Sequence, residues 1–257
     1  MNTSTRDVKL NNHPISVSNK PEYRGFWNVV DSGNWEQFTF KVFDRFLSES
    51  DFYIDVGSWI GPTVIYGALL KKKVYAIEPN PIAFGEMTTN LGLNPDIEKF
   101  TSCHQICIAE SGGVRKFGNR KDGKDSKSSL LFSDKQTTWT VKAKTLSDFV
   151  SENALEDVKF IKMDVEGGEK EILKESADFL RTHKPSLYLS LHAPYFHDKT
   201  KYLNDVFDVL SCYKYIYDEK GKSIKLSPNS FIRKIQLQRF RNEFSSILAT
   251  DTEWHSA

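Results

Sequence analysis

Apolar residues follow two spacings along this chain. Short apolar runs, typical of buried parallel strands, alternate with longer stretches in which apolar residues recur at helical intervals. In residues 35–47, for example, Phe38, Val42, Phe43 and Phe46 fall on one side of a predicted helix. The pattern predicts strands at 52–56, 74–78, 100–109, 140–143, 158–163, 186–191, 213–217 and 245–249, and helices at 35–47, 63–70, 82–91, from 145, 170–180, 202–210 and 230–243.

This alternation of strands and helices predicts a doubly wound α/β fold. We expect a mostly parallel, seven-stranded sheet with helices on both faces, because short links between strand and helix give right-handed crossovers. Residues 1–34 are expected to be an N-terminal leader, loose over residues 1–24, and residues 35–257 a single Rossmann-like domain.

One long polar insertion interrupts the predicted core. Residues 111–136 are rich in Gly, Lys, Asp and Ser. This composition predicts a solvated loop or a hairpin excursion. The alternative is a mobile lid that closes over an active site, since lids come from such loops.

Charge and cysteine content exclude several classes of protein. The formal net charge of +1 indicates no nucleic-acid partner. The three cysteines, Cys103, Cys107 and Cys212, lack the spacing of a disulfide framework or a zinc site. The polar beginning of the chain has no signal-peptide core, and no apolar run is long enough for a transmembrane segment. We therefore expect a cytoplasmic protein; the sequence leaves its oligomeric state open.

Candidate chemistry gathers where the predicted strands end. Asp55, Glu78, Asp164, Glu166 and His192 stand at or just beyond four strand ends. Ligands of open parallel sheets bind beyond the carboxyl ends of the strands, so these five side chains are expected to face one crevice.

The turn after the first strand suggests which ligand binds there. Gly57 and Gly61 allow close approach of the backbone, but neither the dinucleotide fingerprint nor the Walker sequence is present. Asp55 before the turn suits an ammonium group, and Glu78 suits a ribose diol. An amine and a ribose without a pyrophosphate describe S-adenosylmethionine better than NAD. An NAD(P)-dependent enzyme and a catalytically silent cofactor-binding domain remain the alternatives.

Longer strings resemble a known family. The first turn, the following acid and the next helix resemble class I methyltransferases. A later capped helix, a strand ending in two acids and a strand-end histidine resemble the FkbM family of O-methyltransferases, over roughly residues 35–195. The strings are Ile54-Asp55-Val56-Gly57 to Gly61, Glu78-Pro79-Asn80-Pro81, Asn90, Leu93-Asn94, Thr145-Leu146-Ser147-Asp148, Ile161-Lys162-Met163-Asp164-Val165-Glu166-Gly167-Gly168-Glu169 and His192.

The resemblance implies a cofactor, an acceptor and a set of contacts. The cofactor is S-adenosylmethionine, and the acceptor is an oxygen of a small molecule or glycan such as a sugar, polysaccharide or other natural product. Glu78 is expected to hold the ribose. The remaining cofactor-binding residues are expected to be Asp55, Gly57, Ser58 and Gly61 at the methionine, Asn80, Ile108 and Ala109 near the adenine, and Glu36 and Asp164.

Two departures from the family pattern are visible. Ser58-Trp59 stands where the family commonly has Ala-Asn, which brings a bulky ring close to the cofactor. Ser190 stands where the family often has a Glu two residues before the strand-end histidine, so no acceptor or metal role of that Glu carries over.

Methyl transfer to a hydroxyl needs alignment and removal of a proton. We expect His192 to be the base, and Asp164 and Glu166 to orient the hydroxyl. These two acids would also suit a divalent cation, but metal-free catalysis is favoured. Glu169 is interpreted as an acid at a helix N-terminus.

Overall fold

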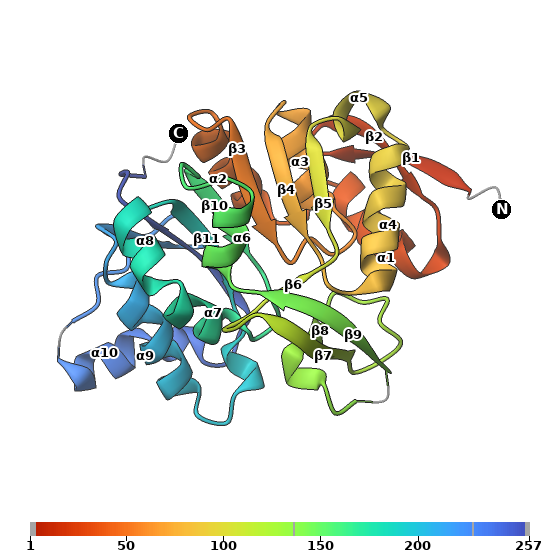
Figure 1. Ribbon diagram of the computed structural model, residues 1–257. Coiled ribbons are helices and arrows are strands. Elements are labelled where there is room, and N and C mark those ends of the chain that lie inside the picture. Colours follow the sequence, from red (N-terminus) through yellow and green to blue (C-terminus); the bar gives the residue numbers. More distant parts are fainter. Residues whose placement is uncertain (1–3, 136, 228, 255–257) are drawn as a thin grey trace.

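A computed structural model describes residues 4–254, except 136 and 228. Its centre is a seven-stranded sheet in the order β12-β13-β11-β10-β3-β4-β5 (Figure 1). The strands are β3 (Phe52–Val56), β4 (Lys73–Ile77), β5 (Thr101–His104), β10 (Phe160–Met163), β11 (Ser186–Leu191), β12 (Tyr215–Asp218) and β13 (Ser245–Thr250). Only the pairs made by β13 are antiparallel. The predicted doubly wound, mostly parallel fold is confirmed.

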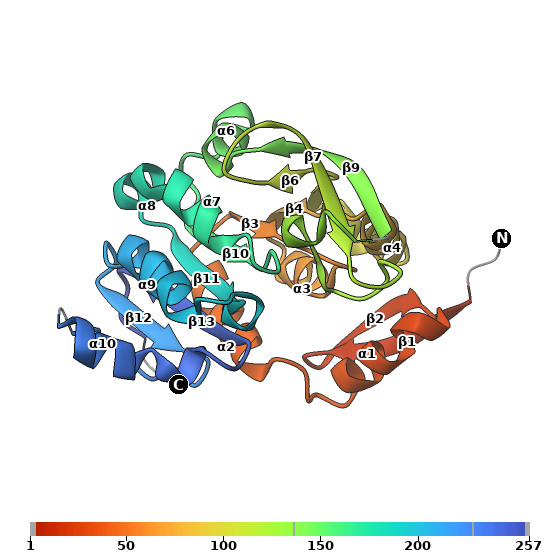
Figure 2. The same cartoon turned by 90° about the horizontal axis from the view of Figure 1, so that it is seen from below.

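Helices cover both faces of this sheet (Figure 2). On one face lie α6 (Leu146–Glu152), α7 (Glu169–Glu175), α8 (Ala177–His183) and α9 (Lys199–Leu210). On the other lie α1 (Pro21–Asp31), α2 (Gln37–Leu47), α3 (Pro62–Leu69), α4 (Pro81–Gly92) and α5 (Pro95–Glu98). The predicted helix 170–180 is divided into α7 and α8. The helix predicted at 230–243 is shorter than expected and forms α10 (Ser230–Gln236).

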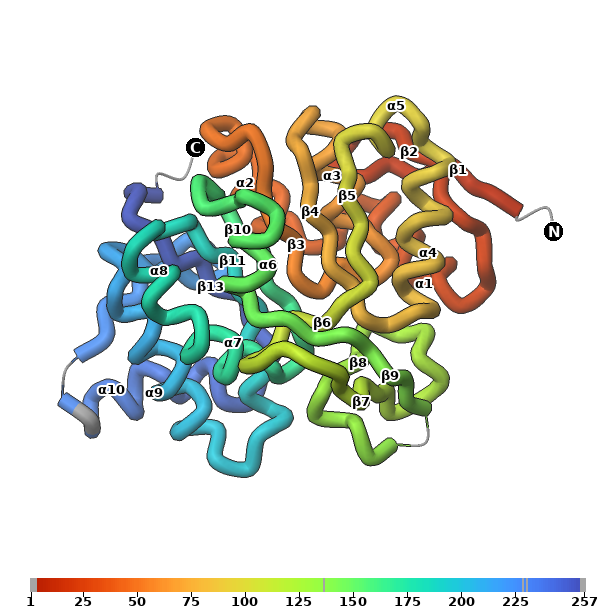
Figure 3. Tube along the Cα trace, viewed as in Figure 1, coloured from red at the N-terminus to blue at the C-terminus, as the bar shows by residue number. Residues whose placement is uncertain are grey.

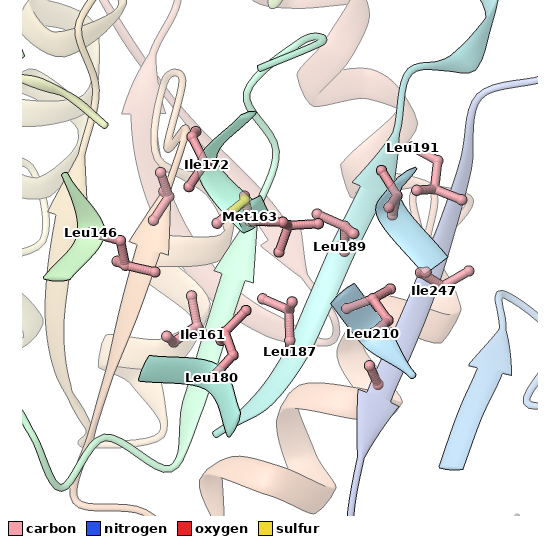
Figure 4. Packing of buried hydrophobic residues seen from close by; sticks show 14 of the residues in the cluster. Leu146, Ile161, Met163, Ile172, Leu180, Leu187, Leu189, Leu191, Leu210 and Ile247 are labelled. Atoms are coloured by element: carbon pink, nitrogen blue, oxygen red, sulfur yellow. The ribbon is translucent and has the colours of Figure 1, made fainter. Parts of the chain in front are cut away.

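Strand side chains alternate between the two cores. Ile161 and Met163 of β10 pack with Leu187, Leu189 and Leu191 of β11 under α7–α9 (Figure 4). Phe160 of β10 and Tyr188 of β11 pack with the helices of the opposite side. Both faces are therefore apolar, which explains why the strands read as continuous hydrophobic runs.

The beginning of the chain is not loose. From residue 5, β1 (Thr5–Leu10) and β2 (His13–Ser18) form an antiparallel hairpin, which α1 follows. Val8 and Val17 are buried in the same core as α1–α4. The expected loose leader over residues 1–24 is thus wrong for its described part, because the hairpin buries the alternating apolar residues Val8, Leu10, Ile15 and Val17. The leader at 1–34 and the single domain at 35–257 remain predictions.

Two asparagines hold this hairpin, and one of them also bonds to the glycine turn. Asn90 accepts a hydrogen bond from the backbone N–H of Ser18 and donates one to the carbonyl of Ile60 within the turn. Asn94 accepts from the N–H of Ser16 and donates to its carbonyl. The asparagines that belong to the family-like string therefore join the hairpin, α4 and the turn.

The polar insertion forms part of a small second sheet in the order β6-β9-β7-β8. Its strands are β6 (Cys107–Ile108), β7 (Gly113–Asn119), β8 (Ser128–Ser129) and β9 (Thr137–Lys144). The predicted strand at 100–109 is split, since β5 joins the large sheet and β6 the small one. A hairpin excursion is confirmed for the described part of 111–136, because β7 and β9 pair in antiparallel (Figure 3). Its closure as a lid remains a prediction.

Within the described residues, the helices are too short or too polar to cross a lipid bilayer.

Candidate functional site

Two cavities adjoin at the carboxyl ends of the central strands. The first lies between the ends of β3 and β4 and the small sheet, and it is lined by Val56, Gly57, Trp59, Ile77, Glu78, Pro79, Asn80, Cys107, Ile108, Phe117, Asp125, Ser126, Ser128, Leu130, Asp164, Val165, Glu166 and Gly168. The second is lined by Glu36, Gln37, Phe38, Thr39, Ser126, Lys127, Asp164, Glu166, Tyr188, Ser190, His192, Tyr195, Glu219, Glu243, Phe244, Ser245 and Ser246. Asp164 and Glu166 line both cavities. We call these two residues the wall between the cavities, because a chemical group that moves from a ligand in one cavity to a ligand in the other would pass beside them.

The structure brings most of the predicted site residues together, but not all in one place. Gly57, Glu78, Asn80, Ile108 and Asp164 line the first cavity. Glu36 and His192 line the second cavity. Ala109 lines a third cavity, which lies elsewhere along the small sheet. Asp55, Ser58 and Gly61 line none of these three cavities.

Gly57 is required by a close approach of two chain segments. Its φ is +82°, and a Cβ at this position would lie 1.7 Å from the carbonyl oxygen of Asp164. Gly61, at φ +91°, would place a Cβ 2.8 Å from Cγ of Met87. The two glycines therefore shape the turn against β10 and α4, and only Gly57 reaches the cavity.

Asp55 does not face the crevice. Its side chain is fully buried, and Lys162 of β10 places Nζ 3.1 Å from Asp55 Oδ1. Lys162 also donates a hydrogen bond to the carbonyl of Gly57. Burial opposes the charge of Lys162, but Asp55 and Asp164 outweigh it and raise its pKa. The Asp55 charge is therefore neutralised beneath the turn, and the expectation that it faces a ligand ammonium group is wrong.

Lys162 was missed by the sequence reasoning. Lys162 interrupts the apolar run of a parallel strand and pairs in register with Asp55. A buried lysine needs an acidic partner, so a lysine within a buried strand was the signal in the sequence.

Glu78 follows β4 and points into the first cavity. Its Oε1 accepts from the N–H of Asn80 at 2.8 Å, and its Oε2 accepts from the N–H of Trp59 at 2.7 Å. Burial nevertheless raises the pKa of Glu78 to about 7. Each carboxylate oxygen keeps a second lone pair, so the pair of hydroxyls of a ribose can still bind here.

Asn80 and Trp59 shape the walls of the first cavity. Asn80 caps α4 through Oδ1, and its amide donates to the carbonyl of Gly123 and to Ser128 Oγ. It thus fixes the small sheet above the cavity. Trp59 lines the cavity, as its place in the glycine turn predicted. Its ring packs edge-on against the ring of Phe26 of α1, with the two ring centroids 4.7 Å apart.

His192 is held by a carboxylate that the sequence reasoning assigned to helix capping. Glu169 is fully buried, and its Oε1 lies 2.6 Å from His192 Nδ1. Burial alone would lower the pKa of His192, but Glu169, Glu166 and Asp164 outweigh it and raise that pKa to about 11. The imidazole therefore keeps its proton at neutral pH when these carboxylates are its only partners. The role of His192 as the base therefore stays a prediction, and it requires that the ring first lose this proton.

The fold and the two cavities define the class of protein. A mostly parallel seven-stranded sheet with one antiparallel strand, a glycine turn after β3 and an acid after β4 are the features of class I methyltransferases. Residues 55–217 match the family model described as the methyltransferase FkbM domain. The chain belongs to this family and is an S-adenosylmethionine-dependent methyltransferase. The alternative of an NAD(P)-dependent enzyme is therefore wrong.

Several solved structures are similar. WbdD, described as a bifunctional kinase-methyltransferase, is 12% identical, with a TM-score of 0.50 over 91% of this chain and 43% of its own. A methyltransferase FkbM from Methylobacillus flagellatus is 20% identical, with a TM-score of 0.49 over 78% of this chain and 43% of its own. An S-adenosylmethionine-dependent O-methyltransferase from Thermotoga maritima is 14% identical, with a TM-score of 0.44 over 86% of this chain and 66% of its own. The chain thus spans less than half the length of the first two. No curated protein matches it significantly.

Cofactor affinity is expected to depend on Glu78. Replacing Glu78 by alanine removes a charged acceptor from the ribose hydroxyls and should weaken S-adenosylhomocysteine binding by about 1.5–3 kcal/mol, roughly tenfold or more. In the wild type, affinity should also fall by about tenfold between pH 8 and pH 6, because protonation through a pKa of about 7 removes one accepting carboxylate. Titration calorimetry at both pH values measures each effect.

The pH dependence separates the role of Glu78 from that of other groups. In Glu78→Ala the loss of affinity between pH 8 and pH 6 should largely disappear. Equal affinity of the variant and the wild type at pH 8 would contradict the assignment.

Proposed function

We propose that this methyltransferase transfers the cofactor's methyl group to a hydroxyl of a neutral, hydroxyl-rich acceptor such as a sugar unit. The observation that carries the proposal is the wall formed by Asp164 and Glu166, which both cavities share. A cofactor in the first cavity would present its methyl group to that wall. An acceptor in the second would approach it from the opposite side, as in-line displacement requires.

The lining of the second cavity favours a hydroxyl-rich acceptor. Hydroxyl groups come from three elements, through Thr39 of α2, Tyr188 and Ser190 of β11, and Ser245 and Ser246 of β13. Hydroxyls both donate and accept hydrogen bonds, so they suit a ligand whose own groups do the same. Phe38 and Phe244 add apolar surface.

The charge of the second cavity disfavours an anionic acceptor. Its lining holds five carboxylates, those of Glu36, Asp164, Glu166, Glu219 and Glu243. Among the described residues of this lining, Lys127 is the one lysine or arginine, although the insertion to which it belongs carries many basic residues. A phosphate or carboxylate on the acceptor would meet like charges, which are costly at short range.

The transfer needs an aligned acceptor and a destination for the acceptor's proton. A lone pair of the acceptor oxygen forms the bond to the methyl carbon while the carbon–sulfur bond breaks and its electron pair stays on sulfur. The carboxylates at the wall orient the hydroxyl by accepting a hydrogen bond from it, and the hydroxyl proton is released to solvent in the open second cavity as the carbon–oxygen bond forms.

A panel of matched acceptors tests this proposal. We expect S-adenosylhomocysteine to form with neutral sugars or glycosides, and kcat/KM to be at least about tenfold lower for the corresponding uronic acid or sugar phosphate. Turnover confined to anionic acceptors would refute the charge argument. No turnover with any hydroxyl compound would refute O-methylation and favour the silent-domain alternative.

A further inference from the structure

Three potential ligand atoms converge at the wall between the two cavities. Asp164 and Glu166 follow β10, and His192 follows β11. One atom from each side chain lies within 4.8 Å of the others. His192 Nε2 is 3.6 Å from Asp164 Oδ1 and 3.4 Å from Glu166 Oε2.

A buried carboxylate, that of Glu169, fixes the orientation of the His192 imidazole. His192 is only 4% exposed, and its Nδ1 is paired with Glu169. Glu169 in turn accepts hydrogen bonds from the N–H of Gly167 and from the hydroxyl of Tyr202. This arrangement directs Nε2 at the two carboxylates. It is also the arrangement by which proteins orient a metal-binding histidine, whose second nitrogen donates to a buried carboxylate.

The carboxylate oxygens of Glu166 and Asp164 differ in their hydrogen bonds. Tyr195 donates a hydrogen bond to Glu166 Oε2 at 2.7 Å. Asp164 Oδ1 is buried, and no described residue donates a hydrogen bond to it. His192 Nε2, 3.6 Å away, is too distant for a hydrogen bond, so this buried oxygen can accept a closer cationic partner.

We propose that Asp164, Glu166 and His192 bind a divalent cation that accepts mixed oxygen and nitrogen ligands, such as Mn²⁺, and that this ion holds the acceptor hydroxyl. The inference rests on the proposed function. Ligands at ~2.1 Å from one ion lie about 3.0 Å apart in an octahedron and about 3.4 Å apart in a tetrahedron. The spacings of 3.6 and 3.4 Å from His192 Nε2 to the two carboxylates therefore need little adjustment. All three residues line the open second cavity, from which an acceptor would reach the ion.

The ion would activate the acceptor hydroxyl. A hydroxyl bound to a divalent cation is more acidic, so its proton leaves to water in the second cavity at neutral pH. The oxygen then forms its bond to the methyl carbon as described above. Another carboxylate of the cavity, that of Glu36, adds negative charge to its lining.

Metal binding is measurable without any acceptor. Electron paramagnetic resonance of Mn²⁺ mixed with the cofactor-free protein should show a single bound ion per chain. Asp164→Asn should weaken binding by more than the ~10–100-fold that loss of an outer partner costs, and Glu169→Gln should weaken it by about that amount. Glu243→Gln, which removes a carboxylate of the same cavity outside the cluster, should leave the affinity unchanged.

The possible results separate this inference from the proposed function. No Mn²⁺ binding by a folded wild type, or equal loss in Asp164→Asn and Glu243→Gln, would overturn the metal site. Asp164 is partly exposed, so Asp164→Asn should fold, and its thermal unfolding checks this. If Mn²⁺ binds as expected but no hydroxyl compound is methylated, the proposed function fails and the metal site stands. If a chelator leaves methylation intact, the catalytic role of the ion fails.

Discussion

Replacing Gly57 by alanine should destabilise the protein by about 2–6 kcal/mol, enough to unfold much of it. Two costs add here. A left-handed backbone strains any residue with a Cβ, and the new Cβ would fall 1.7 Å from a backbone oxygen of Asp164, which no side-chain rotation can relieve. Because β3 and β10 meet at this point, the variant should also lose cofactor affinity.

Urea unfolding of the variant beside a matched control measures this effect. Gly85 lies in α4 and is exposed, and a Cβ at this position would meet no other part of the chain within 4 Å. Gly85→Ala should therefore stabilise the protein by about 0.5–1 kcal/mol. A loss below about 1 kcal/mol in Gly57→Ala would show that the two strand ends separate easily.

Replacing His192 by alanine should lower turnover by ~10²–10⁴-fold and leave cofactor affinity nearly unchanged. His192 lines the second cavity and not the first, so the variant removes a group that contacts the acceptor side alone. His192→Gln should be about as slow, because its amide restores neither the ion ligand nor the pairing with Glu169.

Single-turnover formation of S-adenosylhomocysteine, with an acceptor identified by the panel, gives this rate. His197→Ala serves as the control, since His197 is exposed and lines neither cavity, and it should match the wild type. Recovery of most activity in His192→Gln would mean that His192 only positions the acceptor through a hydrogen bond.

The sequence predicted the large sheet because each strand is buried on both faces. Such strands appear as continuous apolar runs, and their ends then show where polar residues meet. This reasoning placed Glu78, Asp164, Glu166 and His192 correctly around adjoining cavities. It failed for Asp55, which lies inside β3, where alternation turns the side chain toward Lys162 and away from the ligand.

The other failures have physical reasons too. The role of Glu169 depends on His192, 23 residues away in the sequence, and local helix-capping rules carry no information about such a partner. The hairpin of β1 and β2 was missed because its apolar residues alternate with polar ones, so its composition resembles that of a loop. Val8, Leu10, Ile15 and Val17 nevertheless repeat at the spacing of a half-buried strand.

The position of β13 has a consequence for any shortened form of this protein. The matched family segment ends at residue 217, whereas β13 begins at Ser245 and lies between β11 and β12. A chain truncated at the family boundary would leave one edge of β11 unpaired and β12 without a neighbouring strand. Exposed strand edges of this kind recruit other chains, so such a fragment would aggregate. The smallest unit that folds independently therefore extends beyond the segment by which its family is recognised.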